Sequence, residues 1–188
     1  MAKTINFCGD SFCVSDHENS WTNILTNLLG YSTFGRGKNG SAHEHAIQSF
    51  NPNADITVFC WTEPHRLYHS NYAINMNACD SHRKEIPIYE AAYQFYKQIH
   101  ELQYFNDRQK RDLYWFDHEV LSKYIGTIIH LWNFNKTYNF IHGLTVKGCL
   151  INLSSTHKEN TKILNHLSFE QNKLLADKLY KLLRNENG

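Results

Sequence analysis

Short apolar runs and stretches of helical periodicity alternate along the first third of the chain. Residues 4–8 form an apolar run that stops at Gly9, and residues 56–61 form a run of β-branched and aromatic side chains. Both runs are typical of buried strands. Residues 21–29 carry apolar side chains at i, i+3, i+4, i+7 and i+8 and are followed by Gly30, which predicts a helix with a glycine terminator. The chain thus begins with the alternation of an α/β protein.

The same alternation continues to the end of the chain. The other predicted elements are a strand at 31–35, helices at 42–50, 87–102 and 113–124, strands at 127–132 and 149–153, and a helix that follows Ser168. Ser168 begins a Ser-x-x-Gln capping box, which is a strong start signal for that last helix. We expect residues 1–188 to form a single α/β domain, a three-layer α/β/α sandwich with a mostly parallel five-stranded sheet.

The composition narrows the partners that the chain is expected to have. The 19 basic and 18 acidic residues give a net charge of +1. This near-neutral charge does not indicate binding to nucleic acid or to an anionic membrane. No segment approaches the ~20 apolar residues of a membrane span, and the first residues lack a signal-peptide pattern. Five cysteines without CxxC spacing favour free thiols in a reducing compartment. We expect a cytoplasmic protein with no cofactor, no nucleic-acid partner and no membrane partner.

A Gly-Asp-Ser tripeptide at residues 9–11 stands just after the first predicted strand. Ligands collect at the carboxyl ends of parallel strands, so Ser11 is placed like the nucleophile of a strand-to-helix elbow. The tripeptide is also common in ordinary turns and by itself leaves both interpretations open. A glycine-rich loop at 35–40, a long polar segment at 62–86 and His166 follow in order. The long segment is typical of a functional loop or a lid, and all these features would converge on one edge of the sheet.

This ordered set of motifs resembles the four sequence blocks of the GDSL/SGNH hydrolase family. The matching segments are residues 7–12, 39–41, 60–63 and 163–168. The resemblance implies a flavodoxin-like fold and a serine esterase or deacetylase with Ser11 as nucleophile and His166 as its base. It also implies an oxyanion hole made by the Ser11 amide, the Gly40 amide and the Thr62 side chain. The implied substrate is a small acyl ester, with O-acetylated carbohydrate as one candidate.

Two of the four blocks depart from the family pattern. Thr62 stands where the family has an asparagine, and Ile163 stands where it has the aspartate that orients the histidine. Either the serine and histidine act as a dyad, or another acid replaces the aspartate, with Glu63 as the first candidate and Glu159 as the second. These departures favour the alternative that the chain is a binding or structural module with weakened catalysis.

Blocks three and four also carry a narrower similarity. Residues 61–64 and 165–168 are similar to segments of SGNH-like proteins of tailed bacteriophages. This similarity leaves virion association as an alternative to a cytoplasmic location. It also makes a phage particle one setting for the binding or structural module.

Three polar residues beside the blocks are candidates for substrate contact, namely Asp10, Asn39 and Arg66. Arg66 follows the predicted strand at 56–61 by a few residues. Its planar guanidinium suits a carboxylate or phosphate of a ligand. The alternative is that the guanidinium pairs with an acid of the chain itself.

Histidine spacing raises metal binding as a competing chemistry. The recognisable ligand spacings are the His-Glu-His segment at 43–45 and the i, i+4 pair His65 and His69. Neither has a third ligand at a telling distance or the His-Glu-x-x-His arrangement of a metalloprotease. We therefore predict no metal site, and a metal-dependent hydrolase is the third functional alternative.

Aromatic residues are dense on the helices predicted at 87–102 and 113–124. Core or helix-helix packing is the default role for aromatic residues at such positions. Some of them lie outside the apolar stripe. A self-association face, and hence a homo-oligomer, or a platform for stacking sugars are the alternatives for this surplus.

Overall fold

The sheet of the computed structural model has the predicted α/β organisation. The structure describes residues 2–154 and 166–185. The five strands in these residues are β1 (Thr4–Gly9), β2 (Ser32–Phe34), β3 (Ile56–Trp61), β4 (Thr127–Trp132) and β5 (Leu144–Cys149). All are parallel, in the order β2-β1-β3-β4-β5, which is the order of flavodoxin-like doubly wound sheets. The three-layer α/β/α prediction is confirmed, and the sheet is wholly rather than mostly parallel.

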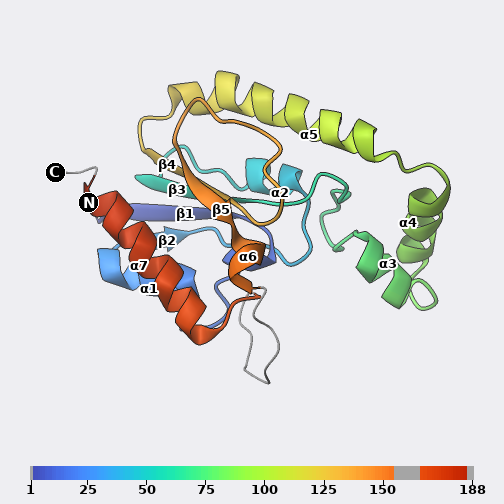
Figure 1. Ribbon diagram of the computed structural model, residues 1–188, viewed down its shortest axis with the longest axis horizontal. Coiled ribbons are helices and arrows are strands. Elements are labelled where there is room, and N and C mark those ends of the chain that lie inside the picture. The colour runs from blue at the N-terminus through green and yellow to red at the C-terminus, as the bar shows by residue number, and fades with distance from the viewer. Residues whose placement is uncertain (1, 155–165, 186–188) are drawn as a thin grey trace.

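Helices cover both faces of this sheet (Figure 1). The α-helices of the described residues are α1 (Trp21–Leu29), α2 (His43–Gln48), α3 (Met76–His82), α4 (Pro87–Gln98), α5 (Leu102–Trp115), α6 (Leu150–Ser154) and α7 (Phe169–Asn185). The core under one face is shared by α1, α6 and α7, and the core under the other by α2 and α5. α3 and α4 enclose a small separate core at one end of the molecule. Within these residues, no helix has the length and apolar character needed to cross a membrane.

The central strands contribute side chains to both cores. Because successive side chains of a strand point to opposite faces, Phe7 joins the core under α1 and α7, while Cys8 joins the core under α5. In β3, Val58 and Phe59 divide in the same way. Burial on both faces explains why these strands are continuous apolar runs in the sequence. The parallel pairing of β1 with β3, with Gly9 opposite Cys60, places the carboxyl ends of these two strands side by side.

Two predicted helix boundaries are confirmed in their hydrogen bonds. α1 ends at Gly30, which has a left-handed φ of +67°. Before α7, the Ser168 amide donates to Gln171 Oε1 over 2.8 Å, and the Gln171 amide donates to Ser168 Oγ over 3.2 Å. This reciprocal capping box starts α7 at the next residue. It thereby sets how the chain arrives from His166.

The fifth strand lies earlier in the chain than predicted. β5 is Leu144–Cys149, and the apolar run predicted as a strand at 149–153 falls mainly in α6. β5 is an edge strand with no fully buried residue, so its sequence lacks the apolar run of a central strand. Leu150 of α6 is buried in the core with α7. Over so few residues, an apolar run does not distinguish a buried helical turn from a strand.

Two helices were missing or shortened in the sequence-based prediction. The polar segment at 62–86 contains α3, and α5 begins at Leu102, well before Leu113. The buried residues of α5 are Phe105, Gln109 and Leu113. A helix that buries so few apolar side chains produces only a weak hydrophobic periodicity. Its first turns are therefore difficult to recognise from sequence.

Candidate active site

Ser11 lies at the carboxyl end of β1 and opens a 3-10 turn, η1 (Ser11–Cys13). Asp10 has extended backbone angles, with φ −100° and ψ −153°, and its carboxylate accepts a hydrogen bond from the Phe12 amide over 3.0 Å. This side-chain cap ends the strand and starts the turn. The local sequence therefore places Ser11 beyond the strand, at the edge of the sheet where ligands collect.

His166 meets Ser11 across 155 positions of sequence. Ser11 Oγ and His166 Nε2 lie 2.8 Å apart, within hydrogen-bond distance. The Phe12 ring packs against the imidazole, with centroids 4.8 Å apart. His166 has a φ of +63°, a left-handed conformation that costs a residue with a Cβ atom on the order of 1 kcal/mol. Such strain persists where the surroundings impose it, and it occurs here at the residue that contacts Ser11.

A pocket of about 830 Å³ opens beside this pair. The predicted site residues that line it are Ser11, Asn39, Gly40, Glu63, Arg66 and His166. Phe12, Phe134 and Ile151 contribute apolar wall. The volume lies within the roughly 300–1,000 Å³ range of small-molecule sites. The structure thus brings together, in a single cavity, residues from all four sequence blocks.

The glycine-rich loop packs closely against the Ser11 turn. The Gly37 amide donates to the Cys13 carbonyl over 3.0 Å, and a Cβ atom at Gly37 would collide with the Asp10 carbonyl oxygen. Gly40 has a left-handed φ of +65° where it lines the pocket, a conformation that glycine adopts without penalty. Within the described chain, neither the Ser11 amide nor the Gly40 amide donates to an acceptor. Both N–H groups are available to an oxygen of a ligand.

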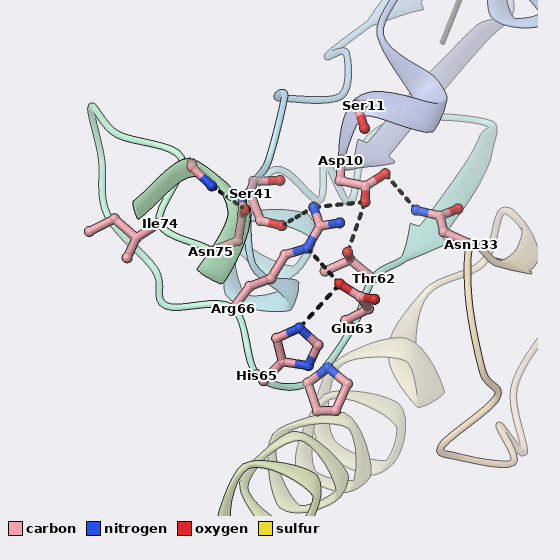
Figure 2. Close-up of polar contacts among 12 residues, drawn as sticks. Asp10, Ser11, Ser41, Thr62, Glu63, His65, Arg66, Ile74, Asn75 and Asn133 are labelled. Carbon is pink, nitrogen blue, oxygen red and sulfur yellow. Dashed lines mark hydrogen bonds and ion pairs between the residues drawn. The ribbon is translucent and has the colours of Figure 1, made fainter. Parts of the chain in front are cut away.

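The Asp10 carboxylate forms a buried hub beneath the pocket (Figure 2). Its side chain is fully shielded from solvent. Besides the Phe12 amide, it accepts hydrogen bonds from Asn133 Nδ2 over 2.5 Å and Thr62 Oγ1 over 2.8 Å, and it lies 3.1 Å from an Arg66 nitrogen. We call Asp10 and these four partners the Asp10 hub. In contrast to the expected substrate contact, Asp10 does not face the pocket; it joins the ends of β1, β3 and β4.

Thr62 and Asn133 hold the Asp10 hub from the ends of two different strands. Thr62 follows β3 and is 2% exposed. A hydroxyl has one proton to donate, and Thr62 donates it to Asp10, so the side chain does not occupy the expected place in an oxyanion hole. Asn133 was not identified from the sequence. The available signal was a polar residue directly after the apolar run at 127–132.

Glu63 is held by His65 and Arg66 (Figure 2). Its Oε2 atom lies 3.3 Å from His65 Nε2 and 3.5 Å from Arg66 Nε. Burial acts to raise the pKa of Glu63, but the hydrogen bond from His65 and the charges of His65 and Arg66 outweigh it, so the pKa lies below its usual value. These contacts direct the carboxylate to Arg66 rather than behind the predicted base. Glu159 and Ile163 lie outside the described residues.

Arg66 lies between two acids of the chain. Its guanidinium contacts Asp10 and Glu63, and it lies 5.4 Å from the centre of the Phe134 ring. The side chain is 9% exposed. Of the two alternatives for Arg66, the structure shows pairing with acids of the chain, and the arginine supplies the positive charge that the buried Asp10 requires.

A cluster with metal-ligating chemistry lies outside the pocket, and its members are His43, Glu44 and Asp112. The buried His43 has Nε2 2.8 Å from Asp112 Oδ2 and Nδ1 3.4 Å from Glu44 Oε2. Arg108 lies 3.3 Å from Glu44 Oε1 and already supplies a positive charge there. These contacts form an ionic link between α2 and α5. His65 and His69 lie in a non-helical segment, so their spacing does not bring them to one helix face.

Comparison with known proteins adds no family to this geometry. No family model, no curated protein and no solved structure matches the chain. A fold of this kind carries many unrelated functions. The functional argument therefore depends on the geometry of the site itself.

Proposed function

We propose that the protein is a serine hydrolase of the SGNH type that cleaves a small acyl ester, with Ser11 as nucleophile and His166 as its base. The observation that carries the proposal is the 2.8 Å contact between Ser11 Oγ and His166 Nε2. A histidine within hydrogen-bond reach of a serine is the arrangement that activates the hydroxyl for attack. The pair also lines a pocket at the carboxyl edge of a parallel sheet, where substrates of such folds bind.

In the proposed reaction, the Ser11 Oγ proton passes to His166 Nε2 while Oγ attacks the ester carbonyl carbon. The electron pair of the carbonyl moves to its oxygen, which accepts hydrogen bonds from the Ser11 and Gly40 amides. Collapse of this intermediate expels the alcohol, which takes the proton from His166. A water molecule then gives a proton to His166 and attacks the acyl-enzyme. This step releases the acid and returns the proton to Ser11.

The Asp10 hub supports this chemistry from below the pocket. Its bond to the Phe12 amide holds the turn that presents Ser11. Arg66 compensates the charge of the Asp10 carboxylate. An unpaired negative charge beneath the pocket would oppose an oxyanion, because Coulomb interactions are strong in a desolvated site. The pairing therefore favours formation of the tetrahedral intermediate.

The lining of the pocket favours a short acyl group on a polar alcohol. Phe12, Phe134 and Ile151 offer apolar contacts to an acyl chain. Asn39 and Asn75 also line the pocket and carry amide groups that can bind hydroxyls. An acetyl ester of a sugar combines these two chemical features.

Replacement of the nucleophile tests the proposal directly. In Ser11→Ala, we expect hydrolysis of p-nitrophenyl acetate to fall by at least about 10³-fold, with loss of labelling by a fluorophosphonate probe. Ser81→Ala is the matched control, since Ser81 is an exposed helical serine that donates only to the Asn77 carbonyl. A wild-type protein that neither hydrolyses the ester nor takes up the label would refute the proposal.

A binding or structural module on the same fold is the second candidate function. It is favoured by Thr62 and Glu63, whose polar groups are engaged by Asp10, His65 and Arg66 and not by the predicted catalytic pair. In this case the Ser11–His166 contact would shape a binding pocket without turnover. Binding of an acetylated sugar by a folded wild-type protein that resists fluorophosphonate labelling would support the module over the enzyme.

A further inference from the structure

The Ser11 pocket is the first of three neighbouring hollows on the surface. A hollow of about 470 Å³ shares Glu63, His65 and Phe134 with it. A third hollow, of about 590 Å³, shares Lys110, Lys136 and Thr137 with the second. Because neighbouring hollows share lining residues, the three hollows lie next to one another along the surface, and we call this row of hollows the basic groove. The groove runs from Ser11 to the space between α5 and the segment that joins β4 to β5.

The far end of this groove is strongly basic. The third hollow is lined by Lys110, Arg111 and Lys136, and no carboxylate of residues 2–154 or 166–185 is part of its lining. None of these three side chains forms a hydrogen bond or ion pair with any residue that the structure describes. Three unpaired cations in one hollow stand out in a chain with a net charge of +1. Among the residues that the structure describes, Glu63 is the one acid that lines any of the three hollows, and Arg66 already compensates it.

Two tyrosines stand among these cations. Tyr114 is 57% exposed and follows Lys110 by four residues on α5, so the two side chains share a helix face. Tyr138 lines the same hollow. Its hydroxyl donates to Asp117 over 3.2 Å, and its ring packs edge-on against Phe140, with ring centroids 4.9 Å apart. The Tyr114 ring packs against His118 with centroids 4.2 Å apart. Aromatic rings that line a hollow are suitable surfaces for stacking a sugar ring.

Hydrogen bonds connect the walls of the groove to Thr62, which directly follows β3. Thr137 Oγ1 donates to Gln109 Oε1 over 2.6 Å, and Gln109 Nε2 donates to the Thr62 carbonyl over 2.9 Å. Gln109 is fully buried. Figure 1 shows the segment between β4 and β5 running alongside α5. The basic end and the Ser11 pocket therefore belong to one preorganised surface, which lowers the cost of binding an extended ligand.

We propose that this basic groove binds an anionic polysaccharide and positions one of its acylated hydroxyls at Ser11. The proposal rests on the proposed function and extends it from a small ester to a polymer. A uronic-acid chain supplies carboxylates for Lys110, Arg111 and Lys136, sugar rings for the two tyrosines, and an O-acyl group for Ser11. A single-stranded nucleic acid would match the cations and the rings, but its phosphodiester backbone carries no acyl ester for Ser11.

The test measures binding in the Ser11→Ala background, where no turnover occurs. The probe is acetylated polygalacturonate, studied by isothermal titration calorimetry. Adding Lys110→Ala, Arg111→Ala and Lys136→Ala together should weaken binding by about tenfold or more, since each exposed charge contact is worth a factor of a few. The matched control replaces Lys173, Lys178 and Lys181 by alanine, because these exposed lysines lie on α7, across the sheet. The control should leave the affinity unchanged.

Several outcomes would contradict the proposal that the groove binds an anionic polysaccharide. Two comparison probes are a neutral acetylated xylan and an oligothymidylate. The contradicting outcomes are equal affinity in the two triple variants, absence of binding to acetylated polygalacturonate, equally tight binding of the xylan, and tighter binding of the oligothymidylate. Unchanged thermal midpoints confirm that both triple variants are folded. The hydrolysis of p-nitrophenyl acetate by the wild-type protein tests the proposed function separately, because that small ester does not reach the basic end. Affinity that falls with rising ionic strength is the further expected result.

Discussion

Two buried carboxylates, Asp10 and Asp117, organise the two ends of the groove in different ways. Both side chains are fully shielded from solvent. Asp10 is bound by a buried arginine and by side chains at the ends of two neighbouring strands. Asp117 is bound by the Ile141 and His142 amides, the His142 ring and the Tyr138 hydroxyl. We call Asp117 and these groups the Asp117 hub.

The difference lies in how each negative charge is compensated. Arg66 carries a permanent charge next to Asp10, whereas Asp117 depends on hydrogen-bond dipoles and a histidine that is 35% exposed. Burial acts to raise the pKa of Asp117, but hydrogen bonds from Ile141, His142 and Tyr138 outweigh it, and the pKa lies below its usual value. Hydrogen bonds can therefore stabilise a buried carboxylate without a permanent cation beside it. Removing the Asp10 carboxylate should therefore lower the free energy of unfolding by a different amount than removing the Asp117 carboxylate, and this difference can be measured.

The largest effect is expected for Asp10→Ala. The substitution leaves the Arg66 charge poorly compensated and removes the cap of the Ser11 turn. We expect the free energy of unfolding to fall by about 3–5 kcal/mol, with loss of ester hydrolysis. Urea denaturation measures the first effect. Asp10→Asn keeps the shape of the side chain and serves as a folded variant if the alanine variant does not fold. A loss below about 1 kcal/mol would show that the Asp10 hub is not a structural centre.

A smaller loss is expected for Asp117→Ala. Its donors lose their acceptor, but no buried permanent charge is left behind, and His142 can turn to water. We expect a decrease of about 2–3 kcal/mol in the free energy of unfolding. Asp107→Ala, an exposed aspartate of α5, is the control and should change it by less than about 0.5 kcal/mol. If Asp117→Ala costs as much as Asp10→Ala, the permanent charge of Arg66 is not what distinguishes the two hubs.

Thr62→Val separates a structural hydroxyl from a catalytic one. The valine keeps the volume and removes the donor to Asp10, so we expect a loss of about 1 kcal/mol in stability. The kcat/KM for p-nitrophenyl acetate should change by less than about tenfold, because the hydroxyl proton is directed to Asp10. Loss of an oxyanion donor would instead lower kcat by about 10²-fold or more. Such a drop, with stability unchanged, would return Thr62 to the oxyanion hole.

The smallest effect is the pH dependence that the Asp117 hub adds to stability. A carboxylate whose pKa is lowered in the folded state stabilises the protein above its unfolded pKa, and this contribution is lost as the pH falls through the folded value. The free energy of unfolding should therefore decrease below about pH 4, and by less in Asp117→Asn than in the wild-type protein. Denaturation at several pH values checks this. Parallel curves for the two proteins would contradict the lowered pKa.

Local signals were sufficient for much of the fold and for part of the site. The apolar run before Ser11 and the capping box after His166 are interactions between near neighbours in sequence, and both are present as predicted. β5 was misplaced because an edge strand buries little of its surface. The start of α5 was missed because a helix with a narrow buried stripe has a weak apolar pattern. The sequence pattern therefore predicted strands and helices best where their side chains are most deeply buried.

The side-chain partners within the site could not be predicted in the same way. Asn133 and Asp10 are 123 positions apart. They meet because β1 and β4 flank the same strand, β3, so their carboxyl ends lie near each other. Nothing in the residues near Thr62 indicates that its hydroxyl would be bound by Asp10 instead of facing the pocket. The basic groove likewise joins α5 to a segment beyond β4 through Gln109. Each contact depends on the order of strands in the sheet and on the packing of helices across it.

The sequence by itself determined the α/β alternation, the place of Ser11 after the first strand and the capped helix behind His166. These features follow from burial periodicity and from hydrogen bonds between residues a few positions apart. Only the tertiary structure decided that Ser11 Oγ lies 2.8 Å from His166 Nε2, that Asp10 faces the interior and that a basic groove extends from the pocket. Those outcomes require distant segments to be brought together, and strand order and side-chain packing control that step.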